Sequence, residues 1–187
     1  MFKNLLLGLL VISPFSALAH PHAFIDMQTK PLVKDNQLIG FSTQWLLDEA
    51  SSSAVLYDVK QAKGDKAAQQ KLVDEVMANV VNEHYFSYVF DKENHKIKYK
   101  KQPENYGARV KGNEVEYYFD FLLAQPQSLQ NNEFTLMTYD RTYYVAMRYA
   151  ETGKRAVDFS SLPANCKGEM LETNVYEKIQ SYASALD

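Results

Sequence analysis

Two consecutive stretches of alternating polarity, separated by one polar turn, constrain the fold of this chain more than any other feature. Residues 23–33 predict a first strand, which Pro31 ends or places at a sheet edge. Residues 34–37 predict a turn, and residues 38–47 alternate so that one face carries Ile39, Phe41, Thr43, Trp45 and Leu47. The pattern therefore predicts an antiparallel hairpin with one face in the core.

Helical periodicity is clearest in residues 66–88. Apolar side chains recur there at spacings of three and four, and they are Leu72, Val73, Val76, Met77, Val80, Val81, Tyr85 and Tyr88. His84 falls inside this stripe, which favours a core position, with a ligand role as the alternative. A short helix is predicted over 54–60, and Asn174 is expected to cap a final helix over 175–186.

Most of the remaining chain is predicted to be strand. The expected strands are 96–101, 114–123, 134–139 and 143–149, with shorter ones at 157–160 and 166–171, and loops at 103–107 and 126–132. The strands 134–139 and 143–149 are expected to be joined across Asp140 and Arg141. The fold class is therefore α+β: an antiparallel sheet with a long helix (about 66–88) and a C-terminal helix packed on it.

The first 19 residues have the layout of a secretory signal peptide. Lys3 precedes an apolar run over 5–15, and Ala17 and Ala19 form the small-residue cleavage pattern. The run is too short to span a bilayer, which takes about 20 residues. Cleavage after Ala19 would leave a single periplasmic domain, residues 20–187, which we expect to be soluble. The net charge of −3 at pH 7 gives no footprint for nucleic acid.

That cleavage would make His20 the first residue of the mature chain. A free α-amine and its own imidazole can chelate a zinc, nickel, cobalt or copper ion, and His22 adds a second imidazole. The amino-terminal copper and nickel site with histidine in third place is excluded, since it needs the amide N–H of residue 2 and Pro21 has none. The alternative is a pair of solvated histidines at a frayed terminus.

Carboxylates are the candidates to complete this site. Hairpin pairing returns the end of the second strand towards His22, so Asp48 or Glu49 is expected to supply an oxygen ligand; an acidic helix start is the alternative. Asp26 lies about 13 Å along an extended chain from His22, so it would act through a hydrogen bond to a ligand imidazole or serve the strand alone. Asp140 is expected to be structural, with a supporting metal role as the alternative.

Catalytic signals are weak. The chain has no Gly-x-Ser-x-Gly, no His-Glu-x-x-His and no phosphate-binding glycine loop. Cys166 is the single cysteine, so an intrachain disulfide is excluded, and we expect a buried small apolar residue there. A cysteine nucleophile with His84 or His95 has no local support. We expect a protein that is not an enzyme.

Several motifs resemble one known family. They are HPHAFID (20–26), WLLDEAS (45–51), YFSY (85–88), YDRTYYVA (139–146) and PANC (163–166). The chain resembles small periplasmic proteins of unknown function labelled "ABC-type uncharacterised transport system, periplasmic component". Members tend to be encoded beside nickel/cobalt efflux permeases or zinc-linked transport genes, which implies a role with transition metals. The family commonly has Pro where this chain has Arg141.

These observations predict a periplasmic accessory protein of a transition-metal transport system. Its partner would be a membrane metal permease or an ABC-type transporter. A chain of this length supplies one domain, so a two-lobed receptor is not expected. The alternative is a non-catalytic module that docks on a permease through its tyrosines, without a metal of its own.

Overall fold

The computed structural model describes residues 23–142, 144–149 and 156–171. The elements in chain order are β1 (Ala23–Lys34), β2 (Gln37–Leu47), α1 (Glu49–Gln61), α2 (Lys66–Asn82), η1 (His84–Phe86), β3 (Ser87–Asp91), β4 (Lys96–Ile97), β5 (Glu104–Lys111), β6 (Glu114–Ser128), β7 (Phe134–Thr138), β8 (Val145–Tyr149) and η2 (Phe159–Ser161). The predicted signal peptide, His20, His22 and the predicted helix 175–186 lie outside the described residues.

The predicted hairpin is confirmed and forms the centre of a five-stranded sheet of order β5-β6-β2-β1-β8. β1 and β2 pair antiparallel from Ile25 opposite Leu47 to Lys34 opposite Gln37. Asp35 and Asn36 form the turn with φ of 50° and 58°, the left-handed pair that two-residue hairpins require. The predicted inward face is right for Phe41, Thr43 and Trp45, which are buried. A bulge between Leu38 and Gly40 buries Leu38 in place of Ile39.

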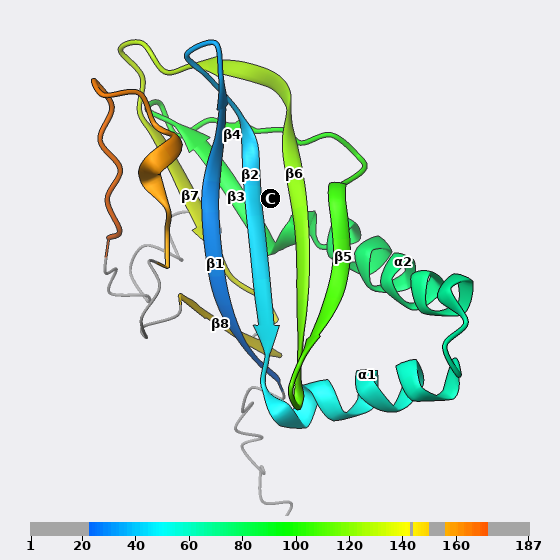
Figure 1. Cartoon of the computed structure of the whole chain (residues 1–187). Helices are drawn as coiled ribbons and strands as arrows, with labels where there is room; N and C mark the ends of the chain where they lie inside the picture. Colours follow the sequence, from blue (N-terminus) through cyan, green and yellow to red (C-terminus); the bar gives the residue numbers. More distant parts are fainter. Residues whose placement is uncertain (1–22, 143, 150–155, 172–187) are drawn as a thin grey trace, which may run out of the picture.

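A second sheet, of order β4-β3-β7, lies behind the first (Figure 1). Buried residues of both sheets, among them Trp45, Val89 and Phe119, belong to one core. Aromatic side chains dominate this core. Phe119 and Phe121 of β6 contact Tyr85, and Trp45 meets Phe119 edge-on with ring centroids 4.8 Å apart. The mixed α+β class is therefore confirmed for the described residues.

The helices lie beside the sheet. α1 begins where β2 ends and runs out past the β5 edge, and α2 returns (Figure 1). Asp48 and Asp65 cap the two helices with their carboxylates. The fully buried residues of α2 are Met77 and Val80, in its C-terminal half, and Val73 and Val76 add partly buried contacts with the core. No described helix is long and apolar enough to cross a membrane.

The predicted helix ends were wrong. The short helix begins at Glu49, not at residue 54, because Asp48 supplies the cap. The long helix ends at Asn82, not at residue 88, because the chain turns left-handed: the φ angles of His84, Tyr85 and Phe86 are 52°, 58° and 49°. Periodicity alone does not show this reversal, since Tyr85 and Tyr88 are buried as a helical stripe would require.

Several strand predictions also need correction. β8 pairs in parallel with β1 in the large sheet, whereas β7 belongs to the small sheet, so the two strands joined across Asp140 and Arg141 do not pair with each other. β4 covers only Lys96–Ile97, β5 occupies the predicted loop at 103–107, and β6 continues to Ser128. Val157 makes one parallel bridge to Thr29, and residues 166–171 contain no strand.

Candidate functional site

Asp48 connects the start of β1 to the start of α1. Its Oδ2 accepts the Phe24 N–H at 2.7 Å, and its own N–H donates to the Phe24 carbonyl at 3.0 Å. The same carboxylate accepts the Ser51 N–H at 2.8 Å and the Ser51 hydroxyl at 3.0 Å. The predicted return of the second strand towards the chain start is thus confirmed as far as Phe24.

Hydrogen bonds keep the Asp48 carboxylate ionised. The Ser51 N–H lowers its pKa most, partial burial opposes this, and the Phe24 N–H and Ser51 hydroxyl lower the pKa further. The positive end of the α1 dipole also favours a negative charge here. Asp48 therefore carries a full charge beside the first residues of β1 at neutral pH.

Asp140 reaches the same end of β1 from the opposite side. It is buried, and its Oδ1 accepts the Thr142 N–H at 2.8 Å while its Oδ2 accepts the Val145 N–H at 2.8 Å. Val145 faces Ala23 in the parallel β1–β8 pair. Burial pushes the pKa of Asp140 up, but the Thr142 and Val145 N–H groups and the Thr142 hydroxyl outweigh it, so the pKa is lowered.

The ionised carboxylate of Asp48 thus bonds directly to β1, and that of Asp140 bonds to Val145, the β8 residue that faces Ala23. Since neighbouring strands lie about 4.8 Å apart, β2 and β8 stand roughly 10 Å apart across β1. His22 directly precedes Ala23 in the sequence. The arrangement places both negative charges near the N-terminal end of β1, which favours a cation there.

Glu49 lies in the first turn of α1 and is exposed. A carboxylate at this position is favoured by the helix dipole without any ligand. Among the described residues, no three histidine, cysteine or acidic side chains cluster around the start of β1. A metal site there needs the histidines that precede Ala23.

Asp26 and His84 were predicted as candidates, and neither lies in this group. Asp26 forms an ion pair with Arg148, its register partner on β8, so its carboxylate serves the sheet. His84 is exposed, which corrects the expected core position, because the left-handed turn rotates it outward. Its ring stacks on Tyr88 with centroids 6.5 Å apart.

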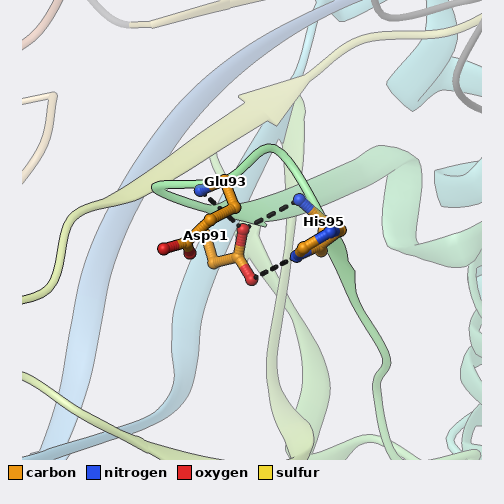
Figure 2. Close-up of side chains that lie close together, drawn as sticks. All are labelled: Asp91, Glu93 and His95. Carbon is orange, nitrogen blue, oxygen red and sulfur yellow. Dashed lines mark hydrogen bonds and ion pairs between the residues drawn. The ribbon is translucent and has the colours of Figure 1, made fainter.

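Another histidine belongs to a cluster that the sequence prediction missed. Asp91, Glu93 and His95 lie together at the turn after β3 (Figure 2). The atoms with which they could bind a metal lie within 4.8 Å of one another. Asp91 Oδ1 accepts the N–H groups of Glu93 and His95, and Oδ2 lies 3.3 Å from His95 Nδ1. These bonds close the turn, and they account for the cluster without a ligand.

A hollow in the described part lies at the other end of β1. It has a volume of about 410 Å³ and is lined by the β1–β2 turn, Ser128–Gln130 and the loop that carries Cys166. Cys166 is half-buried there, not fully buried as predicted, and its Sγ lies 3.9 Å from Asn165 Oδ1. Since β1 is 12 residues long, this hollow lies about 36 Å from the end of β1 at which Asp48 and Asp140 bond.

Ser52 is another residue that the sequence prediction missed. It is fully buried, and its hydroxyl donates to the Leu47 carbonyl at 3.2 Å and accepts the Val115 N–H at 2.9 Å. Asp48 is a favourable N-cap residue that could have indicated the correct start of this helix. A helix that begins directly after Asp48, and not at residue 54, has Ser52 in its first turn.

Comparisons with known proteins identify relatives without a described activity. A protein from Haemophilus influenzae, described as uncharacterized, is 60% identical over 184 residues, which cover 98% of this chain and 87% of the relative. No solved structure matches the chain. The family model "Protein of unknown function (DUF1007)" matches residues 5–187. The chain therefore belongs to the DUF1007 family, whose function is unknown.

Proposed function

We propose that this protein is an exported accessory of a transition-metal transport system, and that it binds a divalent ion at its mature N-terminus. The observation that carries the proposal is that two ionised aspartates hold the start of β1: Asp48 bonds to Phe24, and Asp140 bonds to Val145, which faces Ala23. The membrane partner would be a metal permease or an ABC-type transporter.

The donor set suits a borderline transition metal. The α-amine and imidazole of His20 and the imidazole of His22 are nitrogen ligands that zinc, nickel, cobalt and copper accept. Asp48 or Asp140 would serve as an oxygen ligand or accept the second ring N–H of a ligating imidazole, which orients the ring. Glu49 is a further carboxylate on the rim.

Calorimetry on the exported, processed protein tests the site. Titration with Zn²⁺, Ni²⁺, Co²⁺ and Cu²⁺ is expected to show one high-affinity event in the wild type. The variant His20→Ala/His22→Ala should lose at least 100-fold in affinity, since two ligands are removed. The matched control His84→Ala/His95→Ala removes the other two histidines and should bind as the wild type does.

Two results would overturn the proposal. Equal affinity in the His20→Ala/His22→Ala variant would remove these residues from the site, and loss of binding in the control would move it to the Asp91 turn. N-terminal sequencing of the exported protein checks the remaining premise, because any first residue other than His20 removes the proposed chelate.

Exposed aromatic side chains favour a second candidate function, docking on a permease without a metal. Phe24 and Tyr144 are 44% and 59% exposed at the end of the sheet where the aspartates lie, and Tyr57 is 63% exposed on α1. Side chains of this kind are enriched at protein interfaces. Binding of a metal-free preparation to the permease, unchanged when metal is added, would support this function over the first.

A further inference from the structure

We infer that the start of β1 is mechanically coupled to helix α1, so that a metal bound at the mature N-terminus stabilises that helix. The inference rests on the proposed function for its ligand. The coupling itself rests on the described contacts of Phe24, Asp48 and Ser52, and it can be tested without a metal.

The first link is the double hydrogen bond between Phe24 and Asp48. The Phe24 N–H and carbonyl both bond to Asp48, at 2.7 Å and 3.0 Å. The Asp48 carboxylate also caps α1 by accepting the Ser51 N–H. A displacement of Phe24 would therefore break one of the hydrogen bonds that hold the capping carboxylate in place. The cap and the strand start therefore share one side chain.

The second link is Ser52. Its hydroxyl joins the end of β2 at Leu47 to the start of β6 at Val115, and the side chain is completely buried. It is also the only buried residue of α1. Val55 and Leu56 add partly buried contacts with the core.

The attachment of α1 to the sheet is thus concentrated in its first two turns, next to the start of β1. Beyond them the helix runs past the β5 edge (Figure 1), and residues 60 and 61 are exposed. Helices with few buried contacts open locally at low free energy. Any ligand that binds only the state with the Phe24–Asp48 bonds intact would then reduce this opening.

Hydrogen exchange measured by mass spectrometry tests the coupling in the processed full-length protein. Zn²⁺ at 100 times its dissociation constant should slow exchange in residues 51–56 by up to about 100-fold. The full factor applies if the metal must dissociate before these residues can open. The first turn of α2 is the internal control, because Asp65 caps it in the same way without touching β1. Exchange in residues 67–71 should not change.

A pair of variants at Phe24 tests the coupling with no metal present. Phe24→Pro removes the N–H that Asp48 accepts, and exchange in residues 51–56 should become about fivefold to tenfold faster. Phe24→Ala keeps that N–H and removes only the exposed ring, so it should leave the exchange of α1 unchanged. Equal exchange in the two variants would overturn the inference.

The outcomes separate the inference from the proposed function. Calorimetry that shows no zinc binding would reject the metal site, whereas the Phe24 pair still decides the coupling. Zinc binding with unchanged exchange in residues 51–56 would reject the coupling and leave the metal site standing. The variant Ser52→Ala tests the second link. Zinc should still bind to it, but the slowing of exchange in α1 by zinc should be at least threefold smaller than in the wild type. Slowing as large as in the wild type would contradict the role given to Ser52.

Discussion

The carboxylate of Asp140 accepts the backbone N–H of Val145 at 2.8 Å, and Val145 is the residue of β8 that faces Ala23 of β1. A single side chain thereby closes the turn after β7 and aligns β8 in parallel with β1. Asp48 performs the corresponding task on the β2 side of the same strand. The two aspartates that bring negative charge to the start of β1 are therefore also the residues that build this end of the sheet.

Asp140→Ala tests the structural half of this arrangement. The substitution removes the acceptor of the part-buried hydrogen bonds from the Val145 and Thr142 N–H groups, which should cost about 1–3 kcal/mol in total. The midpoint of urea unfolding should fall accordingly. Asp140→Asn keeps one acceptor oxygen and should lose less, and Glu49→Gln, at an exposed site, should stay within about 0.5 kcal/mol of the wild type.

Asp48→Ala and Asp65→Ala form a matched pair. Both remove a helix cap, which costs about 1 kcal/mol. Asp48 also accepts the Phe24 N–H, a bond without counterpart at Asp65, so Asp48→Ala should be more destabilising by a further 0.5–1.5 kcal/mol or so. Equal losses in urea unfolding would show that the link to Phe24 contributes nothing to stability.

Acid should weaken the fold through the same two groups. The pKa of Asp48 and that of Asp140 are lowered on folding, so their stabilisation is present above the unfolded value of about 3.9. It is lost as the pH falls through the lower folded values. The unfolding free energy of the wild type should therefore drop between about pH 4.5 and pH 2.5. The variant Asp48→Asn/Asp140→Asn should start lower at pH 7 and show a shallower drop.

Metal affinity should respond to pH in a higher range. Imidazole must lose its proton to ligate, and its ordinary pKa is about 6.5. Calorimetry at pH 7.5, 6.5 and 5.5 should show zinc affinity decreasing at each step, with the steepest fall below pH 6.5. Because the aspartates remain ionised throughout, an affinity that stays constant to pH 5.5 would indicate a site made of carboxylates alone.

Contacts between residues close in the sequence were easier to predict than contacts between distant strands. The β1–β2 hairpin was predictable because alternation and a two-residue turn fix its register, and the hairpin geometry then brought Asp48 to Phe24. Nothing in the pattern of residues 143–149 distinguishes a parallel neighbour of β1 from an antiparallel partner of β7. The link from Asp140 through Val145 to Ala23 depends on that choice, so it could not be predicted.

The left-handed turn was unpredictable for a different reason. Three consecutive non-glycine residues, His84, Tyr85 and Phe86, have positive φ, which local preferences disfavour. Packing overrides these preferences: Tyr85 is 1% exposed and stacks on Phe121, and Phe86 meets Trp45 with ring centroids 5.8 Å apart. The contacts that select the turn come from β2 and β6.

His84→Gly measures the backbone strain of that turn. His84 has a φ of 52° and an exposed side chain, and its ring stacks on that of Tyr88. A left-handed residue with a Cβ costs about 1–2 kcal/mol, which glycine avoids. The control His84→Ala removes the imidazole but keeps the Cβ. We therefore expect His84→Gly to be more stable than His84→Ala by about 1 kcal/mol in urea unfolding, whereas equal stability would mean that the turn is unstrained at this position.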